Sequence, residues 1–380
     1  MANATKYVDN VNGNNANTGD SEAQAYANIP TAIAAITGGG NIIYVQAGSN
    51  YTLTSTIALT SALKGDITNG RNRIIGYTTT PGADDGRPVI TSATNSVALF
   101  TLNDNDFWEF KHLNLTHTAT TRGNAFTCVT SMSTPLFFTD LIVDGCASMM
   151  SGNNFNLIDY IRYCEITNCT GSGFTVPAAS ATATFYGCHI HHNTSSGIAT
   201  QANSVTLQVL NSIINNNSIG VNQSQAQNQP VIIRGCTIAN NSSHGVATHS
   251  GNTANPALEV ENSIFYGNGG YGISQGVTQA TFDAYSRFMG WNAFGSNTSG
   301  AYTGIGVMQN EITLSADPFT NAASNDFSLN NTAGGGAACR AVGFQGVFPG
   351  GLTTGYRDIG AAQHQDSGGS SVKGMRILGG

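Results

Sequence analysis

Acidic side chains are the residues of this sequence that could do chemistry, because polysaccharide hydrolysis needs carboxyl groups on one surface, about 5–9.5 Å apart. Glu259 and Glu261 alternate with an apolar residue, so they would project from the same side of a strand. Like charges at that spacing raise the pKa of one carboxyl group, as a general acid requires. We take the two as a candidate catalytic pair. A solvated surface, with Arg234 beside Glu261, is the alternative interpretation.

Further acidic residues stand before and within the segment 108–113. Asp104 and Asp106 belong to the stretch 103–106, and Glu109 follows Trp108. The stretch lacks the ligand spacing of an EF-hand calcium loop, so a polar turn is the alternative interpretation. Asp104, Asp106 and Glu109 complete the set of candidate catalytic residues. Other acidic residues close in sequence are Asp140 with Asp144 and Asp159 with Glu165.

Three histidines lie almost next to each other at 189, 191 and 192. His189 and His191 would face the same side of a strand, and Glu165 would stack against His189 one repeat earlier. Imidazole and carboxylate groups are common metal ligands, but they also form polar surfaces. We expect a polar surface here, with no metal and no other cofactor.

Composition excludes several classes of protein. The chain has 14 Lys and Arg against 21 Asp and Glu, a net charge of −7, which does not favour a nucleic-acid partner. No apolar run is long enough for a membrane-spanning helix, and the opening residues lack the apolar region of a secretion signal. The seven cysteines form no visible disulfide framework, so we expect buried, reduced thiols, as in a protein that folds in a reducing cytoplasm.

Internal repeats dominate the chain from about residue 140 to 275. If the position of Cys146, Cys164, Cys188, Ser212, Cys236 and Ser263 is taken as zero, apolar residues recur at −5, −3, 0 and +2. This alternation predicts two short strands with a bend at −1, where Gly or Asn is frequent. A period near 24 residues is typical of one coil of a parallel β-helix, whose inner face is buried by stacking.

Other repeat positions predict ladders between coils. An Asn at +5 predicts stacked amides, and a Gly at +9 predicts a left-handed or tight turn. In the outer column at −2, Asp144 would lie between Lys111 and Arg162, and Arg234 beside Glu261. The residues at +5 are Asn193, Asn217, Asn241 and Asn268, and those at +9 are Gly173, Gly197, Gly245 and Gly272.

Three regions follow from this pattern. Residues 1–50 are expected to form an N-terminal cap with a helix over 29–36, which begins after Asn28. Residues 51–363 form the β-helix, and residues 364–380 form a Gly/Ser linker and a C-terminal docking peptide. In that peptide Met375, Ile377 and Leu378 would bind a partner by strand addition. A frayed terminus is the alternative.

The coils, the opening segment 7–19 and the closing segment Asp358–Ala361 resemble right-handed parallel β-helix proteins of the pectate-lyase-like superfamily. The resemblance covers roughly residues 5–363 and implies an all-β, right-handed, single-stranded parallel β-helix with an N-terminal capping helix. This fold hosts lyases, hydrolases, epimerases, adhesins and phage tailspikes, so it does not fix an activity. The chain also resembles bacteriophage virion proteins of the tailspike type, but it lacks recognisable head-binding and trimerisation domains.

The resulting hypothesis is a non-enzymatic structural protein of a phage virion, a decoration, fibre or spike component. It would be assembled in the host cytoplasm, attach to other virion proteins through its C-terminal tail and contact host-surface glycans. A homotrimer is what the resemblance implies. The first alternative is a carbohydrate-active enzyme, a polysaccharide depolymerase, lyase or hydrolase. The second is a bacterial surface adhesin, which would be extracellular.

Overall fold

The structure is a computed structural model of the 380-residue chain. It describes residues 3–65, 68–103, 107–129, 135–152, 158–176, 181–200, 205–223, 230–249, 258–276, 289–306, 308–344 and 357–364. The chain divides into two compact units, Met1–Ala183 (unit 1) and Thr184–Gly380 (unit 2).

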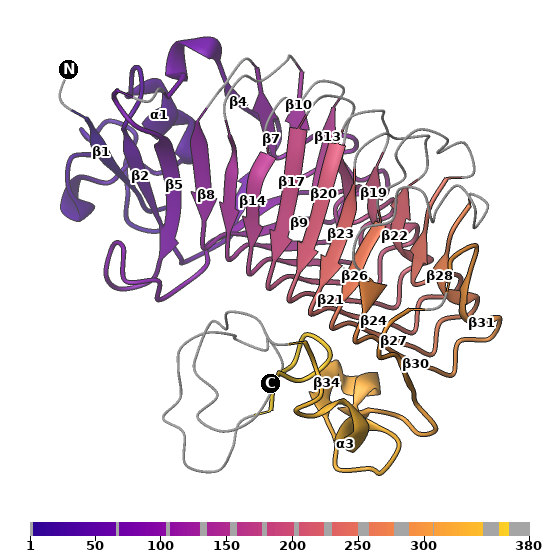
Figure 1. Cartoon of the computed structure of the whole chain (residues 1–380). Coiled ribbons are helices and arrows are strands. Elements are labelled where there is room, and N and C mark those ends of the chain that lie inside the picture. The colour runs from indigo at the N-terminus through magenta and orange to yellow at the C-terminus, as the bar shows by residue number, and fades with distance from the viewer. Residues whose placement is uncertain are drawn as a thin grey trace. The chain divides into compact units, whose positions relative to one another are not determined.

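Unit 1 is built from parallel strands that pair with the equivalent strands of neighbouring coils (Figure 1). The strands of its first sheet are, in order, β1 (Thr5–Val8), β2 (Ile42–Gln46), β5 (Asn72–Tyr77), β8 (Trp108–Lys111), β11 (Phe137–Thr139) and β14 (Ile158–Arg162). Those of its second sheet are β3 (Tyr51–Leu53), β6 (Val89–Ser92), β9 (Asn114–His117), β12 (Ile142–Asp144) and β15 (Glu165–Thr167). Those of its third sheet are β4 (Ile57–Leu59), β7 (Phe100–Leu102), β10 (Phe126–Cys128) and β13 (Met150–Gly152), and β16 (Phe174–Val176) follows in the chain.

Unit 2 repeats the same arrangement. Its first sheet contains β17 (Ala181–Tyr186), which begins at the unit boundary, β20 (Val205–Leu210), β23 (Val231–Arg234), β26 (Leu258–Glu261) and β29 (Met289–Gly290). Its second contains β18 (His189–His191), β21 (Ile213–Asn215), β24 (Thr237–Ala239), β27 (Ile264–Tyr266), β30 (Ala293–Gly295) and β32 (Ile312–Thr313). Its third contains β19 (Ser196–Thr200), β22 (Ile219–Gln223), β25 (Val246–Ala247), β28 (Tyr271–Ser274) and β31 (Gly300–Thr303). The predicted single-stranded parallel β-helix is confirmed.

The helices are few and short, and one of them packs near the start of unit 1. Helix α1 (Ile29–Ala34) begins at Asn28, whose side chain accepts a hydrogen bond from the backbone N–H of Thr31 at 2.9 Å. It buries Ile29 and Ile33 and packs against β1, β2 and β4, as expected of a cap. The other helical turns among the described residues are η1 (Glu22–Gln24), η2 (Ser61–Leu63), η3 (Ala322–Ser324) and α3 (Gly336–Cys339).

The predicted column at position zero is confirmed in unit 2. The strand pairings place Cys188, Ser212, Cys236 and Ser263 in successive coils, and all four are buried. The serines also join the coils, because the hydroxyl oxygen of Ser212 accepts from the backbone N–H of Cys188 at 3.1 Å, and Ser263 does the same for Cys236. The thiols are free, as expected.

The register assigned to Cys146 is wrong. Ile142 pairs with Asn114 on one side and Glu165 on the other, so Leu141, five residues before Cys146, shares the zero column with Leu113 and Cys164. Cys146 instead lies beside Cys169, and both are buried. Burial is the largest cause that raises the pKa of both thiols. Cysteine was a misleading marker because leucine and cysteine fill the same kind of inner position.

The charge ladder expected around Asp144 is wrong for the same reason. The residue between Lys111 and Arg162 is Thr139, which pairs with both. Asp144 lies on the second sheet instead, where its carboxylate accepts from the Asn168 amide at 2.8 Å. The other expected pair is confirmed, since Arg234 and Glu261 are register partners with Nε and Oε2 3.5 Å apart.

The Asn ladder is confirmed in unit 2. Each amide nitrogen donates to the amide oxygen of the next coil, at 3.0 Å from Asn193 to Asn217, 3.2 Å from Asn217 to Asn241 and 3.0 Å from Asn241 to Asn268. The ladder continues to Asn297 at 2.8 Å. These side chains also bond backbone groups, so the buried bend leaves few polar groups unsatisfied.

The glycines at +9 are not left-handed, contrary to expectation. They are needed because neighbouring coils come close at this point. A Cβ atom on Gly245 would lie 2.5 Å from the carbonyl oxygen of Gly272, and one on Gly272 would lie 2.7 Å from that of Ala301. The left-handed bends are at −1 and +4 instead, and in unit 2 they are mostly occupied by Gly and Asn.

A C-terminal segment packs on the outer face of the second sheet of unit 2. It contains the antiparallel hairpin β33 (Phe319–Asn321) and β34 (Asp326–Leu329), whose Phe319 and Phe327 pack beside Ile264 of β27. The closing segment singled out in the sequence anchors it. Asp358 is fully buried and accepts from the backbone N–H of Ala341 at 2.8 Å and from Nδ1 of His364 at 2.6 Å.

Candidate functional site

The bend between the first and second sheets of unit 1 carries two chemically active side chains. His112 and Asp140 both stand directly before position zero of their coils, with φ of 54° in each case. This left-handed conformation is uncommon for residues other than Gly, although Asn, Asp and His adopt it more often than the rest. The same bend holds Tyr163 in unit 1, and Gly187, Asn211, Gly235, Asn262 and Trp291 in unit 2.

The imidazole ring of His112 lies between two carboxylates. Its Nδ1 is 2.6 Å from Oδ2 of Asp140, and its Nε2 is 2.5 Å from Oδ1 of Asp84. Only 6% of the His112 side chain is exposed, against 46% for Asp84. The contact of Nδ1 with Asp140 is a hydrogen bond, whereas Nε2 lies against Asp84 without the geometry of one.

Two cations complete this cluster, which we call the His112 site (Asp84, Arg87, Lys111, His112 and Asp140). Lys111 Nζ lies 2.8 and 3.0 Å from the two carboxylate oxygens of Asp84, and Arg87 donates to Asp140. Burial opposes ionisation of Asp140, but hydrogen bonds from His112 and Arg87 outweigh it and hold its pKa below the usual value. The pKa of Asp84 is also lowered, since Lys111 and His112 outweigh its partial burial.

Local structure explains how the site is held. The loop that carries Asp84 and Arg87 is fixed by Asp85, which accepts from the backbone N–H groups of Thr78, Thr79 and Thr80 at 2.7, 2.9 and 3.0 Å. These hydrogen bonds lower the pKa of Asp85. On the other side, Gly76 lets the backbone of His112 approach, because a Cβ atom there would overlap the His112 carbonyl oxygen.

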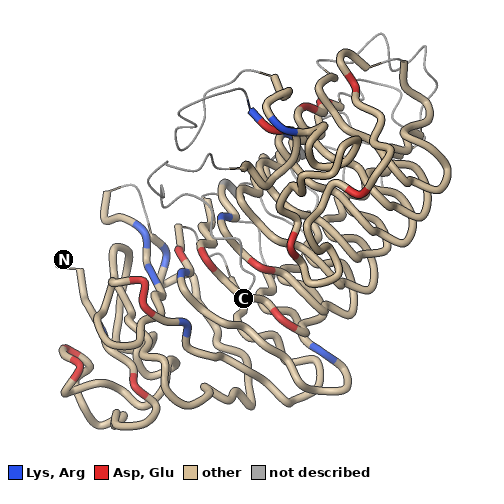
Figure 2. The backbone as a smooth tube through the Cα atoms, turned by 90° about the horizontal axis from the view of Figure 1, so that it is seen from below, with Lys and Arg blue, Asp and Glu red and all other residues tan. Residues whose placement is uncertain are grey.

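Cations and aromatic rings alternate over the neighbouring outer face of the first sheet. Arg71 lies over the Phe137 ring at 3.9 Å, Phe137 stacks on Tyr160 with centroids 5.9 Å apart, and Arg162 lies over Tyr160 at 4.1 Å. Phe137 and Tyr160 are register partners, as are Lys111 and Thr139. Figure 2 marks the positions of the Lys and Arg residues along the chain in blue. Such a surface suits a chain of sugar rings that carries negative charge.

Glu109 lies at the edge of that surface. Its Oε2 is 3.5 Å from Arg71 and 3.4 Å from Arg73, so two cations neutralise it. Glu109 and Lys111 alternate on β8 with the buried Phe110 and therefore share a face. Of the proposed catalytic residues, Glu109 is the one that the described structure places beside the His112 site.

Glu259 and Glu261 do come together in unit 2, through one guanidinium. Arg234 lies 2.8 Å from Glu259 and 3.5 Å from Glu261. Glu259 is buried, at 6% exposed, so the alternative interpretation as a solvated surface is wrong for it, while Glu261 is half-buried. The register neighbour of Glu259 in the preceding coil is Ile232.

The remaining proposed residues lie outside the described residues. These are Asp104 and Asp106, and Met375, Ile377 and Leu378 of the C-terminal peptide.

The His112 site was missed in the sequence for an identifiable reason. Asp84, His112 and Asp140 follow one another in the sequence at intervals of 28 residues, so no local motif joins them. The available signal was the bend position, where ionisable side chains occur at His112 and Asp140, while Gly187, Asn211, Gly235 and Asn262 occupy it in unit 2. The incorrect register of Cys146 moved Asp140 out of that position.

The lowered pKa values of Asp84 and Asp140 predict acid sensitivity of unit 1. A carboxyl group with a folded-state pKa below its unfolded value, here near 3.8, contributes stability above that value and loses it as pH falls through the folded pKa. The melting temperature should therefore fall below pH 4 more steeply in the wild type than in Asp140→Asn, as followed by circular dichroism. Parallel curves for the two proteins would contradict this.

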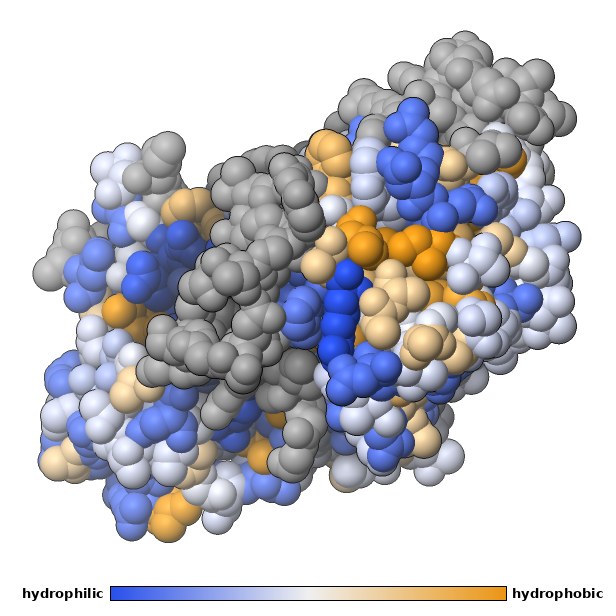
Figure 3. Space-filling model, turned by 60° about the horizontal axis from the view of Figure 1, so that its bottom comes forward, coloured by the Kyte–Doolittle hydropathy of each residue, from blue (hydrophilic) through white to orange (hydrophobic). Residues whose placement is uncertain are grey.

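On the face shown in Figure 3, hydrophilic and hydrophobic residues lie next to each other. Only 9% of the residues in the sequence are charged. Among the large hydrophobic residues that remain exposed, Tyr160 and Tyr163 belong to the coil that follows Asp140, at 37% and 39% exposure. None of the described helices is long and apolar enough to cross a membrane.

Comparison with known proteins supports the architecture. Residues 139–286 match a family model described as a right handed beta helix region. A structure titled pectate lyase Pel9A is 16% identical, with a TM-score of 0.54, over 95% of this chain and 97% of that one. A rhamnogalacturonan lyase is 12% identical, with a TM-score of 0.53, over 87% and 94%. No curated protein matches in sequence. The chain thus has the right-handed parallel β-helix fold predicted for it.

Proposed function

We propose that unit 1 binds an acidic polysaccharide and that the protein is a lyase or epimerase acting on its uronic acid residues. One observation supports the proposal: the carboxylate of the half-exposed Asp84 accepts from Lys111 Nζ at 2.8 Å and lies 2.5 Å from His112 Nε2. Two adjacent donors that bind this carboxylate have the chemistry to bind that of a uronate.

Neutralising the carboxylate is also the chemical need of such a reaction. In both reactions a base takes the proton from the carbon next to the carboxylate, and charge develops on the carboxylate oxygens. Elimination then breaks the bond from the next carbon to the glycosidic oxygen, which leaves with a proton, whereas epimerisation returns a proton to the opposite face of the same carbon. Fixed positive donors stabilise that charge most where water is excluded. Lys111 and His112 would supply the donors, and Asp140, held by Arg87, would orient the ring through Nδ1.

The neighbouring surface supports the same substrate class. Phe137 and Tyr160 offer flat apolar rings, and Arg71 and Arg162 lie on those rings as cations. The two similar structures are titled as lyases, one of pectate and one of rhamnogalacturonan.

The test is turnover of a polysaccharide panel with and without added divalent cations. Pectate, alginate and a glucuronan should include a substrate, detected by ultraviolet absorbance of the unsaturated uronate or, for epimerisation, by proton NMR. Dextran and other neutral glycans should give none. Lack of both turnover and binding across the uronates would contradict the proposal.

Replacing Asp84 with Ala separates a binding role from a structural one. Because the Asp84 carboxylate occupies the donors that would take the substrate carboxylate, its removal should lower KM for a uronate several-fold. Asp20→Ala is the charge-matched control, since Asp20 pairs with Lys6 at an exposed position. An unchanged or raised KM in Asp84→Ala would show that the two carboxylates do not compete.

The virion role and the adhesin role stay predictions of the sequence. So do the docking tail, the trimer, the glycan contacts and the cellular or virion location. Detection of the chain in purified particles would support the virion role without excluding an enzyme, since a particle-borne depolymerase satisfies both.

A further inference from the structure

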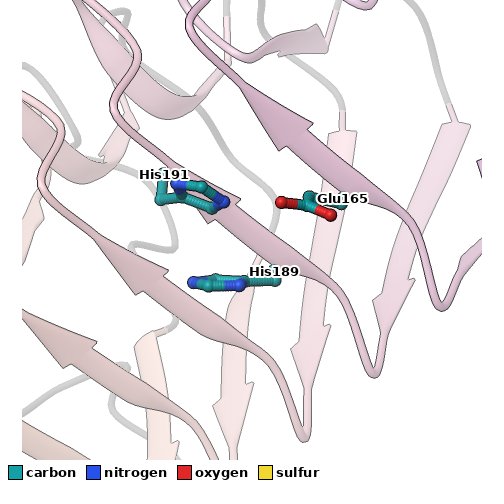
Figure 4. Close-up of side chains that lie close together, drawn as sticks. All are labelled: Glu165, His189 and His191. Atoms are coloured by element: carbon teal, nitrogen blue, oxygen red, sulfur yellow. The ribbon is translucent and has the colours of Figure 1, made fainter. Parts of the chain in front are cut away.

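A second group of ionisable side chains lies on β18 of unit 2, and the proposed function does not use it. His189 and His191 flank the buried Ile190 and so project to the same outer face. Their ring centroids are 4.1 Å apart, and a ring nitrogen of each lies within 4.8 Å of the other. Figure 4 shows the two rings side by side, and also draws Glu165 of β15.

His192 extends the group at the left-handed bend after β18, where φ is 54°. Its Nδ1 lies 2.7 Å from Nδ1 of His191, and its Nε2 lies 3.2 Å from the amide nitrogen of Asn216. Burial first, and then the neighbouring His191, lower the pKa of His192.

An amide orients the ring of His189. Its Nε2 lies 2.8 Å from Oδ1 of Asn215, while the Asn215 amide nitrogen donates to Asn325 at 3.4 Å. An amide oxygen only accepts, so this network assigns the proton to Nε2 and the lone pair to Nδ1 of His189. Outer hydrogen bonds of this kind hold the imidazole ligands of metal sites in position.

We propose that His189 and His191 bind a divalent transition-metal ion of the Zn²⁺ class, with His192 beside them. Imidazole suits zinc, copper and nickel, whereas calcium and magnesium prefer oxygen ligands. Two rings that are already fixed on one strand face bind an ion with little loss of side-chain entropy. Water or further side chains would complete the coordination.

Such an ion would also stabilise the C-terminal hairpin on β18. Asn325, which bonds to Asn215, stands at a left-handed turn between η3 and β34. Phe327 of β34 presents its ring to His189 with centroids 6.2 Å apart, and it is otherwise buried. Fixing the His189 ring thus fixes two contacts of the hairpin.

The test is Zn²⁺ binding to the full, metal-free chain by calorimetry and by thermal unfolding. The melting temperature should rise by roughly 5–10 °C when Zn²⁺ exceeds its Kd about 100-fold, and Mg²⁺ at the same concentration should have no effect. His189→Gln and His191→Gln should each remove the rise. His244→Gln is the matched control, because His244 lies on a different turn, where it accepts from the backbone N–H of Tyr271.

The result is informative whatever the variants do to folding. The melting temperature of each variant is first compared with that of the wild type without metal. If His191→Gln fails to fold, His191→Asn replaces it. An unresponsive wild type, or a rise that persists in both His189→Gln and His191→Gln, would overturn the proposal. Loss of uronate activity would not, because the readout is metal binding and the His112 site belongs to unit 1.

Discussion

Replacing His112 with Gln is expected to lower kcat/KM on the uronate substrate about 100- to 1000-fold, the usual cost of removing one donor from a site that stabilises developing charge. The ring is the central member of the His112 site, with Asp140 at 2.6 Å on one nitrogen and Asp84 at 2.5 Å on the other. The Gln amide can donate to one carboxylate, but it lacks the planar ring that contacts both Asp84 and Asp140. The loss should appear mainly in kcat if the donor acts on the transition state.

Asp140→Asn should have a smaller effect, about 10- to 100-fold, because Asp140 orients the ring rather than contacting substrate. His244→Gln, in unit 2, is the control and should retain full activity. Melting temperatures of all variants are measured alongside, so that unfolding is not mistaken for lost chemistry. Wild-type activity in a folded His112→Gln protein would remove this residue from the mechanism.

Replacing Asn217 with Leu should give the largest loss of stability, roughly 3–5 kcal/mol, because several buried polar groups would lose partners at once. The Asn217 amide nitrogen donates to the carbonyl oxygens of Ile190 and Asn215, at 3.1 and 3.0 Å, and to Asn241 Oδ1 at 3.2 Å. Its oxygen accepts from both nitrogens of Asn193, at 3.1 and 3.0 Å. Leucine has nearly the same size as asparagine, so it leaves little cavity. It offers neither a hydrogen-bond donor nor an acceptor, so the unsatisfied polar groups account for most of the lost stability.

Urea unfolding followed by circular dichroism measures this effect. Asn331→Leu is the control, because Asn331 is exposed and contacts only Arg340 among the described interactions. Surface changes of that kind are usually within about 0.5 kcal/mol. A loss in Asn217→Leu no greater than in the control would show that the amide ladder contributes little to the stacking of coils.

The sequence pattern predicted the coils of unit 2 well and those of unit 1 poorly. In unit 2, Ser212 and Ser263 alternate with cysteines at nearly constant spacing, and the Asn ladder fixes the register independently. In unit 1, Leu141 occupies the equivalent position and Cys146 belongs to another column. Residues of similar size are interchangeable inside a coil, so composition alone cannot choose between such registers.

The chemistry was harder to predict than the fold. Glu259 and Glu261 stand out because they are close in sequence, and Arg234 was correctly expected beside Glu261. Asp84, in contrast, lies in a loop without repeat character and meets His112 only in the folded chain. Contacts of this kind depend on loop geometry, which hydrophobic periodicity does not encode.

The most direct measurement of the central claim is the binding of a uronate oligosaccharide to the folded wild type and to a Lys111→Gln, His112→Gln double variant, by calorimetry. The account predicts measurable affinity for the charged oligosaccharide in the wild type, a loss of at least about 100-fold in the double variant, and no affinity for its neutral, carboxyl-reduced form. Equal affinity of both proteins for the charged sugar, or equal affinity of the wild type for the charged and reduced sugars, would contradict it.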